Sequence, residues 1–394
     1  MSPDLVIVAG ARTPMTEYTG ALKDVSAIDL GAIASRAAIE RSGFSPADFQ
    51  HAVFGNALQT SGDALYGARH VALKAGLPVE VPALTVNRLC GSGIQAIISA
   101  AQMLQLGEAD VVLAGGMESM SQAPHVLRGA RTGLRLGEGK LEDSLMVALL
   151  DTYCGCYMAQ TAENLAGEFD IPRAAQDQYA LRSQQLAARA QNAGVLAEEI
   201  VPVEIRGRKG VERFERDDHL RPDTTLEGLA RLKPAFSKEG SVTAGNASGI
   251  VDGAAAVVVT TLAKAQSGGR QVLGTVRAWE TTGVEPSRMG IGPAPAIRRL
   301  LSRAGLGLGE VDLFEINEAF AAQYLAVEKD LGLDRERVNV NGGAIALGHP
   351  LGATGTRLVL TLLYELRRRK ARYGVAAACI GGGQGIAMLV ERIG

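Results

Sequence analysis

The sequence predicts a layered α/β protein made of two duplicated halves, with a long insertion in the first half. Parts of the chain match other parts in one register, because Arg41 corresponds to Arg303 and Gly93 to Gly355, each pair lying 262 residues apart. Two separate matches at one offset indicate an internal repeat rather than chance. Each half also alternates β-like and helix-like stretches, which is typical of helices packed over a mixed sheet.

Apolar runs predict the main elements in chain order. A glycine-rich turn follows corresponding strands in both halves, and residues 375–378 repeat residues 111–114 with one or two residues of slippage. The expected strands are residues 5–9, 83–86, 111–114, 254–261 and 375–378, and a helix is expected from residue 94 onward.

The repeat pattern breaks between residues 122 and 248, where a helix is expected over residues 171–193, opened by Pro172. The sequence therefore predicts three units: residues 1–121 plus 249–268, an inserted loop domain of residues 122–248, and residues 269–394. Several basic residues in the insertion could hold a phosphate-bearing ligand, although a solvated surface role is favoured for most of them. They are Arg206, Arg208, Lys209, Arg213 and Arg221.

Composition limits the classes of function. The 394 residues are 47% hydrophobic and 21% charged with a formal net charge of −2, so no general attraction to nucleic acid or to an anionic membrane is expected. No uninterrupted apolar run approaches the roughly 18 residues that a membrane span needs. The four cysteines do not resemble a disulfide framework, and the first strand leaves little room for a targeting segment, so a cytoplasmic location is expected.

Cys90 is the first candidate for a reactive side chain. It lies in the run Asn-Arg-Leu-Cys-Gly-Ser-Gly at residues 87–93, between a predicted strand and a predicted helix. Backbone N–H groups and the dipole at a helix N-terminus favour a thiolate, so a lowered pKa is expected for this thiol. The alternative is a small buried hydrophobic residue, which describes most free cysteines.

Two further reactive side chains occupy similar glycine-rich turns near the end of the chain. His349 follows Gly348, and Cys379 precedes the run Ile-Gly-Gly-Gly-Gln-Gly. A cysteine and a histidine that are distant in sequence but adjacent in the fold form a known nucleophile-and-base pair. If the two halves pack together, these residues and Cys90 meet in one crevice.

The motifs around these residues resemble those of the thiolases, the acetyl-CoA acetyltransferases and 3-ketoacyl-CoA thiolases. The resemblance spans the whole chain and also includes Asn-Glu-Ala-Phe at 317–320, Gly-His-Pro at 348–350 and Val-Thr-Ala-Gly-Asn-Ala-Ser at 242–248. It implies a thiolase fold with a five-layered α-β-α-β-α core, and a loop domain that binds coenzyme A (CoA) and supports tetramer formation.

The resemblance also implies a role for each catalytic residue. Cys90 would attack a thioester carbonyl while His349 accepts its proton, and Cys379 would then remove the α-proton of a second acetyl-CoA. His349 and a water held by Asn317 would form one oxyanion hole, and the backbone N–H groups of Cys90 and Gly381 the other. The implied activity is reversible Claisen condensation of two acetyl-CoA molecules to acetoacetyl-CoA and CoA.

Further residues match positions that contact CoA or the acyl group in the family. The expected partners are acetyl-CoA, acyl-CoA and free CoA as substrates, with no permanently bound cofactor and no metal. Residues 128–145 resemble the loop through which short-chain thiolases form tetramers, so a homotetramer built from two dimers is expected. The matching contact residues are Arg221, Phe236, Ala244, Ser248, Tyr157 and Met158.

Three alternatives stay open at this stage. Tyr157 stands where biosynthetic thiolases commonly carry a histidine, so a broader 3-ketoacyl-CoA thiolase is possible, and the physiological direction of the reaction is open. A related 3-ketoacyl synthase would carry a different residue, such as a second histidine, in place of Cys379. A non-catalytic acyl-CoA-binding protein would lack at least one of Cys90, Asn317, His349 and Cys379.

Overall fold

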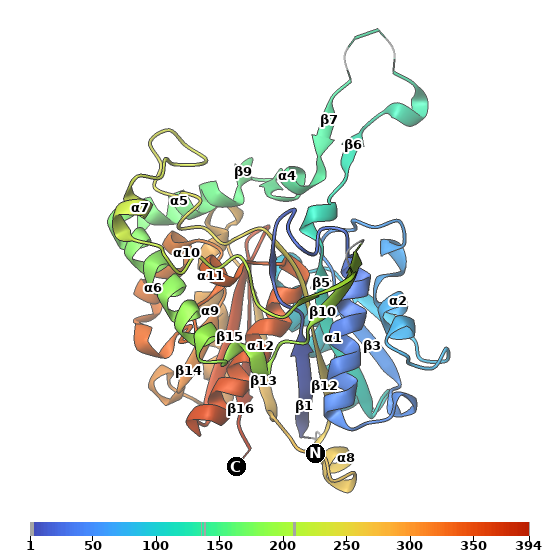
Figure 1. Ribbon diagram of the computed structural model, residues 1–394. Helices are drawn as coiled ribbons and strands as arrows, with labels where there is room; N and C mark the ends of the chain where they lie inside the picture. Colours follow the sequence, from blue (N-terminus) through green and yellow to red (C-terminus); the bar gives the residue numbers. More distant parts are fainter. Residues whose placement is uncertain (1–3, 135, 138, 208–209, 394) are drawn as a thin grey trace.

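The computed structural model describes residues 4–134, 136–137, 139–207 and 210–393. Within these ranges a ten-stranded sheet runs in the order β14-β15-β16-β13-β1-β12-β5-β3-β4, with β2 paired to β12. Figure 1 shows the first half of the chain in blue on one side and the second half in orange and red on the other. The strands are β1 Leu5–Arg12, β2 Thr16–Glu17, β3 His51–Gly55, β4 Ala83–Val86, β5 Val111–Glu118, β12 Val251–Thr261, β13 Gly274–Gly283, β14 Leu313–Ile316, β15 Tyr373–Ile380 and β16 Gln384–Glu391.

The two halves have the same strand arrangement, which confirms the duplication. In the first half, β1, β12 and β5 are antiparallel neighbours and β3 runs parallel to β5. In the second half, β13, β16 and β15 are antiparallel neighbours and β14 runs parallel to β15. The domain boundaries at residues 121, 248 and 268 stay a prediction.

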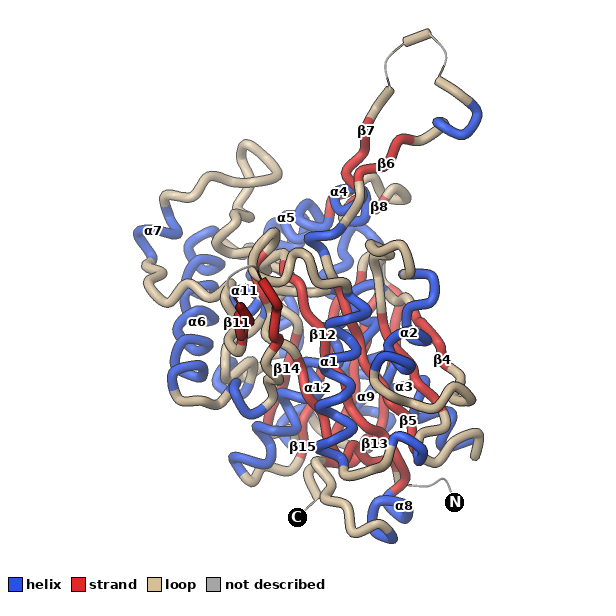
Figure 2. Tube along the Cα trace, turned by 45° about the vertical axis from the view of Figure 1, so that its right-hand side comes forward, coloured by secondary structure: helices blue, strands red, loops and turns tan. Residues whose placement is uncertain are grey.

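Helices complete five layers, as the resemblance implied. Helices α1 (Ala27–Ser42) and α2 (Gly67–Lys74) cover the outer face of the first half, and α9 (Pro293–Ala304) and α10 (Ala321–Leu331) cover the outer face of the second. Helices α3 (Ser92–Leu106) and α12 (Leu351–Arg369) pack against each other between the two sets of strands. The alternation of helices and strands is visible in Figure 2.

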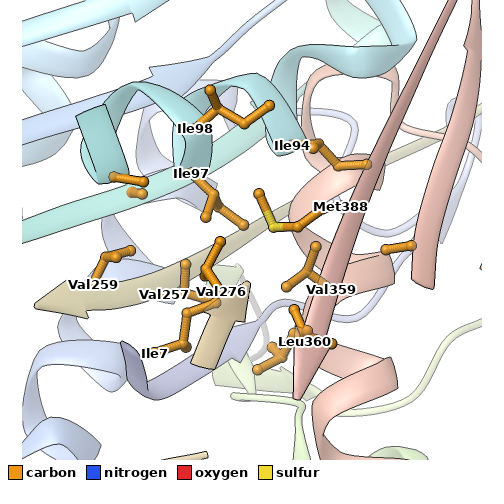
Figure 3. Close-up of a cluster of buried hydrophobic side chains, with 14 of the residues drawn as sticks. Ile7, Ile94, Ile97, Ile98, Val257, Val259, Val276, Val359, Leu360 and Met388 are labelled. Carbon is orange, nitrogen blue, oxygen red and sulfur yellow. The ribbon is translucent and has the colours of Figure 1, made fainter. Parts of the chain in front are cut away.

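The central layer depends on two glycines from the repeat. A Cβ atom on Gly93 would lie 2.4 Å from the backbone nitrogen of Thr356, and one on Gly355 would lie 2.4 Å from that of Ile94. The backbones of the two helices are therefore in direct contact at these glycines. Around them, side chains from both halves interdigitate in one apolar core, shown in Figure 3 for Ile94, Val359 and their neighbours.

One helical segment, residues 89–106, is long and apolar enough to cross a membrane by length and composition, with a mean hydropathy of 1.2. It contains α3, and 61% of the segment is buried inside the protein. Since α3 packs between the sheets against α12, we assign its apolar character to the core.

The described part of the inserted region contains three short hairpins and a set of helices. Strands β6 and β7 form an arm that projects away from the body of the molecule (Figure 1). Strands β10 and β11 carry Arg206 and Arg213, of which Arg213 pairs with Glu215 at the surface; Arg208 and Lys209 lie outside the described residues. The remaining elements are β6 His125–Leu127, β7 Leu141–Asp143, α4 Ser144–Ala148, β8 Leu150–Asp151, β9 Cys156–Tyr157, α5 Met158–Glu168, α6 Arg173–Asn192, β10 Val203–Gly207, β11 Gly210–Phe214, α7 Leu226–Ala230, α8 Leu262–Ser267 and α11 Ala344–Leu347.

Candidate active site

Cys90 lies in the short 3-10 helix η3 (Leu89–Gly91), which joins β4 to α3. Leu89 has a φ of 47°, a left-handed conformation that a leucine rarely adopts. The hydroxyl of Ser92 holds the turn by accepting from the backbone N–H of Arg88 at 2.8 Å and donating to the Leu89 carbonyl at 2.7 Å. Strain of this kind is typical of a turn that presents a functional side chain.

The predicted low pKa of Cys90 is wrong for this conformation. Cys90 is partly accessible to solvent, yet the surrounding protein removes enough water from the thiol to raise its pKa to about 11. A hydrogen bond from the backbone N–H of Gly381 opposes this rise and is outweighed by burial. Nearby Glu118 raises the pKa of Cys90 further, so Cys90 rests as a neutral thiol.

Cys379 lies at the end of β15, beside Cys90. Its side chain is fully buried, and burial followed by the neighbouring Cys90 raises the pKa of its thiol well above the usual range. The turn to β16 passes close to the nucleophile loop, because a Cβ atom on Gly381 would lie 3.0 Å from Leu89 and 3.4 Å from the sulfur of Met158. Cys90, Cys379 and Gly381 are therefore together, as the sequence predicted.

His349 and Asn317 form a second group, and Asn317 is tied to the strand of Cys379 because its backbone N–H donates to the carbonyl of Ala377 at 2.9 Å. The Nδ2 atom of Asn317 lies 3.3 Å from Nε2 of His349, and Nδ1 of His349 lies 2.6 Å from the hydroxyl of Thr354. Burial, assisted by nearby Arg357, lowers the pKa of His349 to about 3, so the imidazole is neutral at physiological pH. A neutral imidazole can accept a proton from a thiol.

Asn317 can also hold a polar ligand. Its side chain is fully buried, and its Oδ1 has no hydrogen-bond partner among the residues that the structure describes. Buried amide oxygens are normally hydrogen-bonded, so the unpaired Oδ1 beside the imidazole is suited to accept a hydrogen bond from a water molecule. That water can in turn donate to a substrate oxygen.

Only two of the residues predicted to contact CoA or the acyl group line one cavity. A cavity of about 580 Å³ is lined by Arg221 and Ala244, together with His219, Leu229 and Leu232 of the inserted region. The residues described as lining this cavity do not include Phe236, which is 41% exposed, or Ser248, Tyr157 and Met158. Ser248 instead donates its backbone N–H to the carbonyl of Ala319, and Met158 packs near Cys379.

Sequence reasoning missed two side chains next to the site. The carboxylate of Glu118 accepts four N–H groups, from Asn56, Ala57, Leu58 and Gly352, and so ties the first half to the start of α12. Burial nevertheless raises the pKa of Glu118 to about 7. The other missed residue is Thr354, which the repeat could have revealed because it lies 262 residues after Ser92.

The described residues contain no group of three or more histidine, cysteine, aspartate or glutamate side chains placed to hold a metal ion. Cys154 and Cys156 are both free and partly exposed, and the Cys156 thiol reaches back to the carbonyl of Cys154 at 3.6 Å.

Comparison with known proteins agrees with this fold. Residues 5–263 match the family model of the thiolase N-terminal domain, and residues 270–392 match that of the thiolase C-terminal domain. The chain is 51% identical to the mitochondrial 3-ketoacyl-CoA thiolase of Homo sapiens over 98% of this chain and 97% of that protein. It is 50% identical to an acetyl-CoA acetyltransferase of Cupriavidus necator over 99% of each.

The similarity extends to three dimensions. The crystal structure of human mitochondrial 3-ketoacyl-CoA thiolase in complex with CoA matches with a TM-score of 0.97 and 50% identity, covering 99% of this chain and 98% of that one. The fold, the two adjacent free cysteines and the buried histidine are those of an acyltransferase. The chain belongs to the thiolase family, and thiolase activity on CoA thioesters follows from that membership.

Proposed function

We propose that this thiolase is an acetyl-CoA C-acetyltransferase, which condenses two acetyl-CoA molecules reversibly to acetoacetyl-CoA and CoA through an acyl-Cys90 intermediate. The observation that supports the proposal is the proximity of Cys90 to Gly381 and Cys379, and of His349 to Asn317, whose backbone N–H donates to Ala377 on the strand that carries Cys379. A thiol nucleophile, an imidazole base and a second thiol are the groups that the two half-reactions need.

In the first half-reaction the sulfur of Cys90 attacks the carbonyl carbon of acetyl-CoA, and the thiol proton moves to Nε2 of His349. The S–C bond of the substrate then breaks, and CoA leaves as a thiol that takes up the proton. The backbone N–H of Gly381, already directed at the Cys90 sulfur, is placed to stabilise the carbonyl oxygen as negative charge develops on it.

In the second half-reaction the thiol proton of Cys379 first moves to Nε2 of His349, because the raised pKa of Cys379 keeps this residue protonated at rest. The resulting thiolate removes an α-proton from a second acetyl-CoA, and the carbanion attacks the carbonyl of acyl-Cys90. The acyl–sulfur bond breaks and the Cys90 thiolate takes the proton from His349, so that both cysteines end as thiols. Oxyanion stabilisation must supply much of the rate because a thioester α-proton is weakly acidic, and we assign this role to His349 and to a water on the unpaired oxygen of Asn317.

We place the nucleotide end of CoA at the cavity of about 580 Å³, where Arg221 can meet phosphate and where Ala244 forms part of the wall. Ser248, Tyr157 and Met158 are proposed to line the path from this cavity to Cys90, and Phe236 to close over it. The CoA complex of the human relative supports the same class of ligand.

The second candidate is a 3-ketoacyl-CoA thiolase with a broader substrate range, favoured by Tyr157 and by the identity to the human protein. The two are separated by thiolysis rates for acetoacetyl-CoA and for 3-ketoacyl-CoAs of increasing length, with Cys90→Ser as the control. Fast cleavage confined to acetoacetyl-CoA supports the acetyltransferase. Equal or faster cleavage of longer chains supports the broader enzyme, and cleavage of none would overturn both.

We also propose a homotetramer assembled through the arm of β6 and β7, and a cytoplasmic location. The arm exposes large apolar side chains, including Leu134 at 58% and Leu141 at 63%, which is typical of a surface that binds another protein. Replacing the arm by a short glycine linker should convert a tetramer to a dimer in light scattering. A dimer in the intact protein would contradict the tetramer.

A further inference from the structure

We infer that Thr354 is a positioning residue for catalysis, which holds the proton of His349 on Nδ1 and leaves Nε2 unprotonated, so that Nε2 can exchange its 3.3 Å contact with Asn317 for the Cys90 proton. This inference rests on the proposed role of His349 as the base. It concerns a residue that touches His349 and none of the reacting atoms.

The contacts around Thr354 define the direction of the hydrogen bonds. Its hydroxyl lies 3.0 Å from the carbonyl oxygen of Pro350, which can only accept, and 2.6 Å from Nδ1 of His349. Since a hydroxyl has one proton, donation to Pro350 leaves it to accept from an Nδ1–H group. In this tautomer Nε2 of His349 carries no proton and faces Nδ2 of Asn317 at 3.3 Å. The amide N–H is then the donor and the imidazole nitrogen the acceptor.

The surroundings preserve this arrangement. Thr354 is fully buried and His349 is 6% exposed, so water competes little with the protein for these groups. The backbone of His349 is also held, because its N–H donates to the carbonyl of Gly249 at 2.9 Å. A base with the proton on the wrong nitrogen cannot accept at Nε2, and residues that set a histidine tautomer typically affect rate strongly.

The internal repeat gives independent support. Ser92 and Thr354 occupy equivalent positions in the first turns of α3 and α12, 262 residues apart. Ser92 accepts a hydrogen bond from the turn that carries Cys90 and donates to a carbonyl of that turn. Thr354 donates to the carbonyl of Pro350, in the turn that carries His349, and contacts the imidazole of His349 itself. Each half thus uses one hydroxyl at the start of its central helix to hold its own catalytic turn.

The test compares Thr354→Val, which keeps the shape and loses the hydroxyl, with Thr354→Ser, which keeps it. Thr356→Val is the matched control, because Thr356 is equally buried on α12 and donates to the carbonyl of Gly93 at 3.2 Å without touching His349. We expect Thr354→Val to slow Cys90 acylation about 10- to 100-fold with KM changed less than about threefold, as for other residues that orient a functional histidine. Serine should restore the rate to within about threefold, and Thr356→Val should change it less than about twofold.

The tautomer itself is read by nitrogen NMR of protein labelled at its five histidines, with His349→Asn used to assign the His349 signals. Protonated Nδ1 in the unmodified enzyme supports the inference, and a proton on Nε2 overturns it even if the valine variant does not fold. If His349→Asn still acylates at the normal rate, the proposed base fails. If His349→Asn is inactive while Thr354→Val keeps full activity, only the positioning role fails.

Discussion

Replacing Asn317 by aspartate should convert His349 from a permanently neutral base into one that titrates near neutral pH. The substitution puts a carboxylate oxygen about where Nδ2 now lies, 3.3 Å from Nε2 of His349. With an effective dielectric constant of about 20, two unit charges at this distance attract by about 5 kcal/mol. Since about 1.4 kcal/mol corresponds to one pKa unit, the pKa of His349 rises from about 3 to near 7.

The rate of acyl-enzyme formation should therefore fall as the pH is lowered below 8. A group with a pKa near 7 loses most of its neutral form between pH 8 and pH 6, so the rate for Asn317→Asp should fall about tenfold over that interval. The unmodified enzyme should show no inflection from His349 there, because a pKa of about 3 keeps the imidazole neutral. The assay is the burst of CoA released on mixing excess enzyme with acetyl-CoA between pH 5.5 and 9.

Asn317→Ala separates electrostatics from the loss of the amide. It should change the rate of acyl-enzyme formation by a similar factor at every pH, and it should lower the rate of the condensation half-reaction by about 10²- to 10³-fold, the usual effect of removing an oxyanion-hole group. If Asn317→Asp also lowers the rate uniformly, the carboxyl has stayed neutral in its buried position and the reasoning about His349 is refuted. Circular dichroism at pH 6 and pH 8 excludes unfolding as the source of the fall in rate.

Three further predictions concern other parts of the molecule. Cys379→Ala should retain acyl-enzyme formation while slowing exchange of the acetyl-CoA α-protons with deuterated water by at least about 100-fold. Tyr157→Ala should raise kcat/KM for longer 3-ketoacyl-CoAs relative to acetoacetyl-CoA, by roughly 10-fold for each methylene accommodated, as chain-length series will show. Gly116→Ala should destabilise the protein by at least about 3 kcal/mol in urea unfolding, because the new Cβ would lie 1.9 Å from the Gly352 carbonyl oxygen. The control is Gly167→Ala in α5, where a Cβ meets open space, and this change should be neutral or slightly stabilising.

The repeat was the feature of the sequence from which most of the fold could be predicted. The offset between Gly93 and Gly355 located the two central helices, and the structure shows these glycines at their contact. Element ends were less predictable, because β12 begins at Val251 rather than at residue 254, where pairing with β2 extends it. Hydrophobic pattern marks the core of a strand, while its ends depend on neighbours in space.

The candidate site was predictable only where a reactive residue stood in a distinctive turn. Cys90, His349 and Cys379 could be recognised because glycines surround them, but Glu118 could not, since nothing local shows that four N–H groups converge on its carboxylate. Three of those donors come from the loop that follows β3 and one from α12. Such a cluster exists only after the chain has folded, so no local pattern in the sequence contains it.

The pKa of Cys90 shows how burial can reverse a local expectation. Position near a helix N-terminus favours the thiolate, yet burial raises the pKa of the thiol to about 11, while that of His349 is lowered to about 3. Both shifts therefore disfavour transfer of the proton before bond formation. We expect the proton to move as sulfur attacks the carbonyl and the oxyanion is stabilised.

This reasoning makes the reactivity of the free enzyme testable. Alkylation of Cys90 by iodoacetamide, followed by mass spectrometry of the modified peptide, should accelerate about tenfold for each pH unit from pH 7 toward pH 10, because only the thiolate reacts. The direction follows from the raised pKa, since the reactive form is scarce below pH 11 and grows as pH rises. A rate that is already on a plateau at pH 7 would reveal a thiolate in the resting site, and the proton would then move to His349 before the substrate arrives.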